Sequence, residues 1–270
     1  MKFAYLVMYE LRALHSTAEK INKYIIEHFN ADVILVCQKT FDDDEERIKL
    51  LKNVKYAKLY DKPDAIKYFG FENIKEEKKF YRCSFTKSNM QIYINFYEMK
   101  KVVEEIYKNY DYFIIVRVDI DILFNFPPLT LFKSLSPQNF KFHQYSCGSW
   151  KESGMGNIIH RDSILDYLSS YYDYITQIIK KTNNILDSQE ELFYKSLLYK
   201  NIKVTPIENL GFYFTATTLN DYTTWSKPVI HPKYKVICKY EGNCDEAFKN
   251  LELWNKGLRW SYTNNKICLI

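Results

Sequence analysis

The sequence predicts an α/β fold with a mixed central sheet flanked by helices, and three observations carry that prediction. Short apolar runs rich in β-branched residues predict buried strands at 2–8 and 31–37, and a third strand is predicted at 54–60. A stretch with helical spacing, 15–29, separates the first two runs and completes a strand–helix–strand unit. A long helical stretch at 88–109 then leads into an unusually apolar run, 113–116, which predicts a strand buried on both faces.

The same patterns place the remaining elements. Helices are expected at 129–135, 162–181 and 187–199, and strands at 140–145, 200–207 and 211–217. Ser16 or Thr17 is expected to cap the helix at 15–29. The acidic run 42–46 should lie in the first turn of a helix that reaches Leu51, where carboxylates complement the helix dipole. From residue 221 onwards no clear repeat or domain linker is visible.

The amino-acid composition limits the classes of protein to which this chain can belong. The chain has 270 residues, of which 47% are hydrophobic and 26% charged, so it can bury a sizeable core. Its net charge of +5 comes without a basic block, which argues against nucleic-acid binding and suits a small anionic ligand. Six cysteines without a C-x-x-C pair argue against structural zinc and favour reduced thiols in a cytoplasmic protein. We expect no signal peptide and no transmembrane segment.

The stretch after the apolar strand at 113–116 carries the chemistry. In an extended chain, residues two apart point to the same side, so Arg117, Asp119 and Asp121 share one face. In sheets covered by helices, ligands bind beyond the carboxyl ends of the strands, where these residues fall. Two carboxylates there can hold a divalent cation that takes phosphate oxygens as further ligands. The alternative is that the aspartates only suit a turn at the strand end.

The segment 146–157 is expected to be an active-site loop. It holds three of the seven glycines of the chain. Gly148, Ser149 and Trp150 are its candidates for substrate binding, and an ordinary connection is the alternative. Gly154-Met155-Gly156 lacks the third glycine and the strand-to-helix turn of a dinucleotide-binding motif, which excludes a nicotinamide site.

The order of these elements resembles the GT-A class of glycosyltransferases, and more narrowly small bacterial and viral enzymes of surface-polysaccharide synthesis. Its Arg117-Val118-Asp119-Ile120-Asp121 segment is similar to the arginine and D-x-D pattern of that class. Arg12 follows the first strand where such proteins carry Gly-Gln-x-Arg, although Tyr9-Glu10 replaces Gly-Gln here. Further similar segments, at the expected distances, are 31–33, 110–112, 190–192 and 202–204.

The resemblance implies a single GT-A-like domain over 1–270 with a Rossmann-like N-terminal half. Residues 1–126 would bind a nucleotide-sugar donor, for which we expect a UDP-sugar, and 127–270 would bind a glycan or other hydroxyl acceptor. The expected cofactor is Mn²⁺ or Mg²⁺, which bridges the donor's diphosphate and stabilises the leaving nucleotide. The location would be the cytoplasm, of the host cell if the protein is viral. Inverting and retaining chemistry both remain open.

The resemblance also assigns roles to individual side chains. Asp119 and Asp121 would hold the metal, with His231 completing its shell or, alternatively, packed structurally. Arg12 and Arg117 would contact the donor. In an inverting enzyme, the base that takes the acceptor's proton would be one of three carboxylates at the start of a helix, Asp187, Glu190 or Glu191. The alternative is that Asp187 and Glu190 only cap that helix.

Two rival functions are compatible with parts of the pattern. Asp119-Ile120-Asp121 is similar to the motif of haloacid-dehalogenase-type phosphatases, in which the first aspartate is the nucleophile. Here no threonine follows the second aspartate, and an α/β segment precedes the motif instead of following it. The other rival is a non-catalytic nucleotide- or glycan-binding protein of the same fold.

Overall fold

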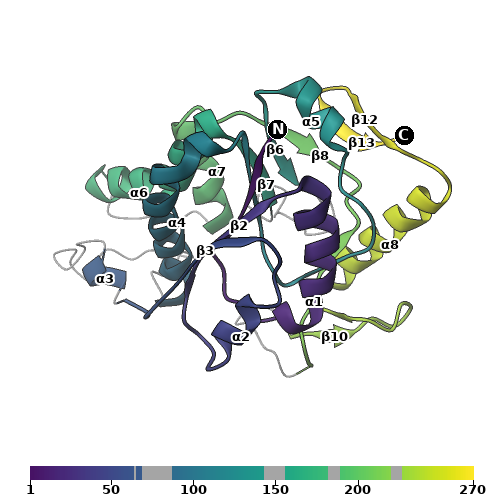
Figure 1. The fold of residues 1–270 in the computed structure, drawn as a ribbon, viewed down its shortest axis with the longest axis horizontal. Helices are drawn as coiled ribbons and strands as arrows, with labels where there is room; N and C mark the ends of the chain where they lie inside the picture. The colour runs from purple at the N-terminus through teal and green to yellow at the C-terminus, as the bar shows by residue number, and fades with distance from the viewer. Residues whose placement is uncertain (64, 69–86, 143–155, 182–188, 220–226) are drawn as a thin grey trace.

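A computed structural model describes residues 1–63, 65–68, 87–142, 156–181, 189–219 and 227–270 (Figure 1). Its centre is a nine-stranded mixed sheet in the order β12-β13-β8-β6-β7-β4-β1-β2-β3. The strands are β1 (Phe3–Val7), β2 (Asp32–Gln38), β3 (Val54–Tyr60), β4 (Tyr112–Val116), β6 (Asn139–Phe142), β7 (Gly156–His160), β8 (Val204–Ile207), β12 (Trp260–Thr263) and β13 (Lys266–Leu269).

The four strands β3, β2, β1 and β4 form a parallel block. Beyond it, β7 runs antiparallel to both β4 and β6, and β12 runs antiparallel to β13. The expected α/β class with a mixed central sheet is therefore confirmed. The parallel block matters for function because the carboxyl ends of β1 and β4 meet at one edge, where ligands bind in such sheets.

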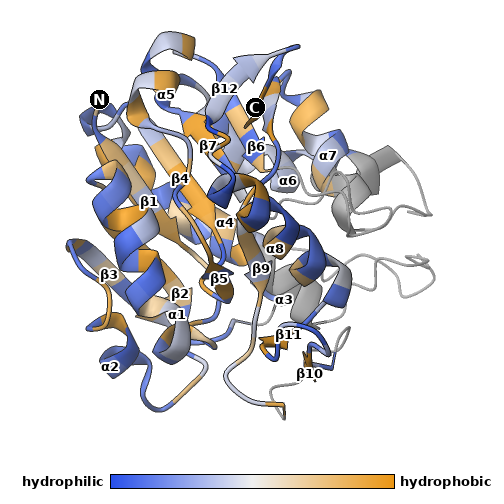
Figure 2. Ribbon diagram, turned by 90° about the vertical axis from the view of Figure 1, so that its right-hand side faces the viewer, coloured by the Kyte–Doolittle hydropathy of each residue, from blue (hydrophilic) through white to orange (hydrophobic). Residues whose placement is uncertain are grey.

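Helices cover both faces of the sheet. They are α1 (Leu14–Ile21) with a π-helical continuation η1 (Asn22–Glu27), α2 (Asp44–Ile48), α3 (Ala65–Tyr68), α4 (Lys87–Ile106) with a 3₁₀ turn η2 (Tyr107–Asn109), α5 (Leu129–Leu135), α6 (Arg161–Lys181), α7 (Gln189–Tyr199) and α8 (Glu241–Asn255). Figure 2 shows the hydrophobic residues concentrated in central strands such as β1 and β4, while α1 and α8 carry many hydrophilic residues.

The alternation of side chains along the central strands explains the two layers. Phe3, Tyr5 and Val7 of β1 join one core cluster with residues of α1 and α5. Their neighbours Ala4 and Leu6 join a second cluster with residues of α4, α6 and α7. Both faces of β1 are fully buried, which is why its sequence is a continuous apolar run. Full burial of one such large side chain contributes roughly 1.5–3 kcal/mol.

Several local expectations need correction. Ser16 and Thr17 do not cap α1, because they lie inside it and their hydroxyls donate to the carbonyl of Ala13 at 2.9 and 3.0 Å. The acidic run does fill the first turn of α2, but that helix ends at Ile48 instead of reaching Leu51.

The predicted loop at 146–157 is also too long, because its last two residues begin β7. Residues 146–155 lie outside the described part of the chain. Gly156 is required here by a close approach: a Cβ at this position would lie 2.1 Å from Cδ2 of Phe142. A glycine in a strand weakens the sequence pattern, so β7 was mistaken for loop.

No described helix combines the length and the apolar character needed to cross a membrane. Cys37, Cys238, Cys244 and Cys268 are buried and unbridged, while Cys83 and Cys147 lie outside the described residues.

Candidate functional site

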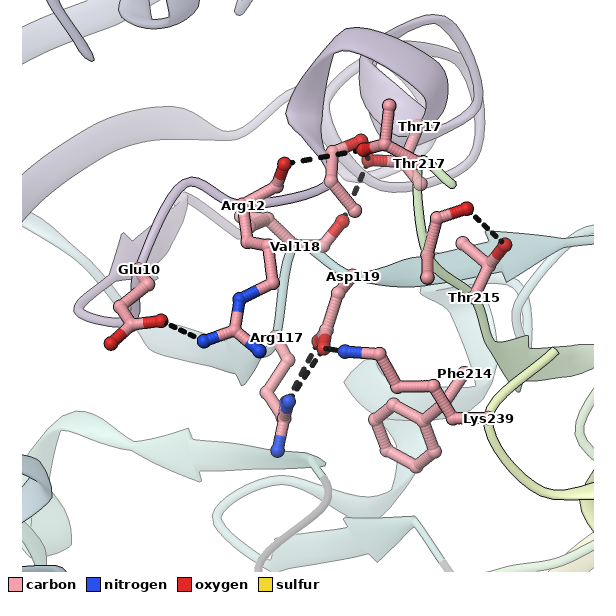
Figure 3. Close-up of polar contacts among 12 residues, drawn as sticks. Glu10, Arg12, Thr17, Arg117, Val118, Asp119, Phe214, Thr215, Thr217 and Lys239 are labelled. Atoms are coloured by element: carbon pink, nitrogen blue, oxygen red, sulfur yellow. Dashed lines mark hydrogen bonds and ion pairs between the residues drawn. The ribbon is translucent and has the colours of Figure 1, made fainter. Parts of the chain in front are cut away.

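The backbone at the end of β4 is held by two other segments, α1 and the strand β9 with the residue after it. After Val116 the chain forms β5 (Ile120–Ile122), which pairs antiparallel with β9 (Phe212–Phe214). The Thr17 hydroxyl of α1 donates to the carbonyl of Val118 at 2.7 Å, and the Thr215 amide donates to the carbonyl of Asp119 at 3.0 Å. Asp119 is therefore fixed beyond the carboxyl end of β4, beside α1 and the strand β9 (Figure 3).

The carboxylate of Asp119 pairs with two cations, Arg117 and Lys239. We call these three residues the Asp119 centre. Arg117 donates from Nε to Oδ1 at 2.7 Å and from a terminal nitrogen to Oδ2 at 2.5 Å. The ammonium of Lys239 donates to Oδ2 at 2.6 Å. Lys239 comes directly after β11 (Ile237–Cys238), and its amide donates to the carbonyl of Phe214 at 2.9 Å. In Figure 3 the lysine and the arginine approach the carboxylate from different sides.

Burial differs sharply within the Asp119 centre. The side chains of Lys239 and Asp119 are only 1% and 6% exposed, whereas that of Arg117 is 39% exposed. Burial alone would raise the pKa of Asp119, but the charges of Arg117 and Lys239 hold it well below its usual range. The guanidinium of Arg117 also lies over the ring of Phe214, 5.2 Å from its centroid. It is thus a partly exposed cation with a fixed orientation.

The turn after β1 adds a second arginine to the same edge of the sheet. Arg47 donates to the carbonyls of Leu11 and Arg12 at 3.0 and 2.7 Å, and the Thr217 hydroxyl donates to Arg12 at 3.3 Å. The Arg12 side chain, 22% exposed, pairs with Glu10. Figure 3 shows it pointing toward the Arg117 side of the centre. This edge therefore presents two partly exposed guanidinium groups.

Tyr9 lies in the same electrostatic environment. Burial raises the pKa of its hydroxyl to about 12; the nearby charge of Arg117 lowers it and that of Asp119 raises it. The phenol therefore stays protonated at neutral pH. It occupies the position where the resembling enzymes carry glycine.

Asp121, the second aspartate of the motif, has different partners. It pairs with the ammonium of Lys20 on α1, and the Tyr213 hydroxyl donates to its Oδ2 at 2.6 Å. Its side chain is 20% exposed and that of Lys20 is 40% exposed. The two carboxylates are thus each neutralised by cations of their own.

The donor set does not fit the metal ion that the resemblance implies. The expected ligands Asp119, Asp121 and His231 are all described, yet the described residues contain no group of three His, Cys, Asp or Glu side chains able to hold a metal. Two unit charges about 4 Å apart repel by about 4 kcal/mol at an effective dielectric constant of ~20, and a divalent ion doubles this. An ion bound to Asp119 would meet this repulsion from buried Lys239.

His231 serves a local turn instead. Its Nδ1 accepts the backbone amides of Lys233 and Tyr234 at 3.2 and 3.3 Å, and its Nε2 lies 3.4 Å from a carboxylate oxygen of Asp245. The ring is 3% exposed and stacks on Tyr234 at 4.8 Å. It follows β10 (Val229–Ile230), whose pairing with β11 delivers Lys239 to the site. These contacts match the alternative that His231 is packed structurally.

Several expected site residues cannot be placed. Gly148, Ser149, Trp150 and Asp187 lie outside the described residues, as do the side chains of Glu190 and Glu191. Their roles stay predictions. Conversely, Lys239 was missed, because no motif marks it and it lies 120 positions from Asp119. A lysine directly after a short apolar strand is the only local signal.

Comparison with known proteins adds little. No protein-family model and no curated protein matches the chain. Among solved structures, one similar chain is described as the crystal structure of a glycosyltransferase involved in the glycosylation of the major capsid of PBCV-1. The identity is 12%, the match covers 76% of this chain and 80% of that chain, and the TM-score is 0.39. An identity and a TM-score this low assign no function to this chain, so the functional conclusion depends on the site.

Proposed function

We propose that this protein is a glycosyltransferase that moves a sugar from a nucleotide-diphosphate donor to a hydroxyl acceptor. The observation that carries the proposal is the Asp119 centre, which holds the partly exposed guanidinium of Arg117 at the carboxyl ends of β1 and β4. That edge is the ligand-binding position of parallel sheet blocks. Arginine suits a diphosphate because its planar fork matches phosphate oxygens. The GT-A-like motif pattern of the sequence agrees with this assignment.

The chemistry requires charge stabilisation more than any other contribution. The acceptor oxygen attacks the anomeric carbon, the bond from that carbon to the phosphate oxygen breaks, and its electron pair leaves with the nucleoside diphosphate. Fixed cations near the phosphates stabilise the charge that develops on the leaving group. Arg117 and Arg12 are the groups we assign to this task. The acceptor's proton goes to a base, for which Asp187, Glu190 and Glu191 stay the predicted candidates.

The finer features of the enzyme stay predictions. These are a UDP-sugar as donor, a glycan as acceptor, and the division into a donor half at 1–126 and an acceptor half at 127–270. Lys239 of the second half takes part in the Asp119 centre of the first. Dependence on Mn²⁺ or Mg²⁺ also stays a prediction, and the proposal does not rely on it.

The phosphatase alternative is less compatible with the geometry. A nucleophilic Asp119 would need an oxygen free to attack phosphorus, but both of its oxygens accept hydrogen bonds from Arg117, and one also accepts from Lys239. Turnover of p-nitrophenyl phosphate, abolished in Asp119→Asn, would restore that alternative.

The decisive test is a screen of nucleotide sugars for hydrolysis, read as released nucleoside diphosphate, in parallel with and without Mn²⁺. We expect release from at least one donor in either condition. Direct binding of nucleoside diphosphates, measured by isothermal titration calorimetry, accompanies the screen. Binding without turnover would favour a non-catalytic binding protein, and neither binding nor turnover would refute the proposal.

A further inference from the structure

Each carboxylate oxygen of Asp119 accepts a hydrogen bond from a cationic side chain. Oδ1 accepts from Arg117 at 2.7 Å, and Oδ2 accepts from Arg117 at 2.5 Å and from Lys239 at 2.6 Å. A metal ion needs a carboxylate lone pair directed at it, with short oxygen–metal distances and near-octahedral geometry for Mg²⁺. Three of the roughly four lone-pair directions of this carboxylate are therefore occupied by N–H groups.

These donors belong to the fold and cannot easily leave. Lys239 is 1% exposed at its side chain, and its backbone is tied to β9 by the hydrogen bond to Phe214. Displacing its ammonium would leave a buried charge without a partner, which proteins avoid. Asp121 differs, because its partner Lys20 is 40% exposed and can swing into solvent. One accessible carboxylate is a poor site for a hard divalent ion when no phosphate supplies further ligands, and the described histidines and carboxylates do not complete such a site.

The exposure gradient shows which part of the centre faces a ligand. It rises from Lys239 and Asp119, which are buried, to Arg117 at 39%. Arg12, at 22%, points to the same side in Figure 3. A ligand arriving at this edge therefore meets the two guanidinium groups and the Glu10 carboxylate that pairs with Arg12, while Asp119 and Lys239 lie behind them.

We propose that Asp119 is a positioning carboxylate and not a metal ligand: together with buried Lys239 it fixes the guanidinium of Arg117, which with Arg12 binds the diphosphate of the donor without a divalent cation. The proposal rests on the proposed function, since it assumes a nucleoside diphosphate as ligand. It replaces the expected role of Mn²⁺ or Mg²⁺ by that of two arginines.

The first experiment measures metal binding without any nucleotide. The full chain is titrated with Mn²⁺ and followed by electron paramagnetic resonance of the free ion, for the wild type and Asp119→Asn. We expect no Mn²⁺ site that depends on Asp119. A site that is present in the wild type and lost in Asp119→Asn would overturn the inference, whatever the enzymatic activity.

The second experiment measures binding of UDP, GDP, CDP and ADP by calorimetry, in Mn²⁺ and in EDTA. We expect the affinity for the preferred nucleotide to agree within about twofold between the two conditions, a difference of less than about 0.5 kcal/mol. An affinity that falls about tenfold or more in EDTA refutes the inference but keeps the proposed function. Failure of all four nucleotides in both conditions refutes the proposed function and the inference together.

A charge-preserving variant tests the positioning role. Arg117→Lys keeps the positive charge but loses the fork that contacts Asp119 and the phosphates, so we expect the affinity in EDTA to fall about tenfold or more. Arg161→Lys is the matched control. Arg161 is 44% exposed and pairs with Asp111, which precedes β4 and so lies at its opposite end. Equal affinities of the two variants would overturn the assignment of Arg117.

Discussion

The Asp119 centre and a second group of charges, the Glu98 cluster, contain similar chemical groups in different surroundings. The Glu98 cluster consists of Glu98 on α4, Lys58 on β3, Lys101 and Tyr68. Glu98 accepts from Lys101 at 2.6 Å and from Lys58 at 3.1 Å, and its side chain is 9% exposed. Each group therefore has one buried carboxylate held by two cations.

The difference lies in the exposure of the cations. Lys58 and Lys101 are 42% and 52% exposed, so they stay hydrated while they screen Glu98. The side chain of Lys239 is 1% exposed, so its ammonium is shielded from solvent. Hydrated ion pairs contribute about 0–1 kcal/mol each, whereas removing one partner of a buried pair costs roughly 3–5 kcal/mol. Similar groups thus make a solvated network at one place and a rigid support for Arg117 at the other.

The largest expected effect is on stability. Lys239→Met should lower the free energy of unfolding by about 3 kcal/mol, at the low end for a broken buried pair because Arg117 still contacts Asp119. Lys58→Met, the matched change in the Glu98 cluster, should cost less than about 1 kcal/mol. Urea denaturation of both variants measures the difference.

Similar losses in the two lysine variants would show that burial does not separate the two groups. The double variant Asp119→Asn with Lys239→Met supplies a further check. Because both charges are removed together, its loss should be smaller than the sum of the two single losses.

A smaller effect is expected at the second aspartate. Tyr213→Phe removes the hydroxyl that donates to Asp121 at 2.6 Å, a bond to a charged acceptor, and should cost about 1.5 kcal/mol. Tyr68→Phe removes the hydroxyl that donates to Glu98, where two lysines remain as donors, and should cost less. Thermal denaturation of the two variants at equal pH compares them. A larger loss in Tyr68→Phe would contradict the ranking.

A further effect is pH-dependent. Burial alone would raise the pKa of Glu98, but hydrogen bonds from Lys101, Tyr68 and Lys58 lower it from 4.5 to about 2. A carboxylate with a lowered folded pKa stabilises the protein above its unfolded value, and this contribution is lost as the pH falls through the folded value. Glu98→Gln should therefore flatten the fall of Tm between pH 4.5 and about 2. An unchanged slope in that window would show that Glu98 titrates normally.

Much of the fold follows from local sequence patterns. The runs at 2–8 and 31–37 are strands because continuous apolar β-branched residues suit a sheet covered on both faces. The predicted strand at 54–60 is β3 at the edge of the sheet, where its residues are exposed or half-buried. The helical stretch at 88–109 matches α4 and η2 for a similar reason, since its apolar stripe needs a sheet to cover. The position of Arg117 and Asp119 beyond the end of β4 was also predictable, because it depends only on that strand.

The charge state and partners of the motif were decided by tertiary structure. Nothing in Arg117-Val118-Asp119-Ile120-Asp121 indicates that one aspartate meets a buried lysine and the other a lysine on α1 and a tyrosine on β9. Local periodicity determines which residues face inward, because it acts over a few positions. Which charges meet depends on where distant segments cross, and the hairpin of β10 and β11 brings Lys239 across 120 positions to Asp119. Burial at that crossing then determines whether the carboxylate is available to a metal ion or stays paired with an arginine.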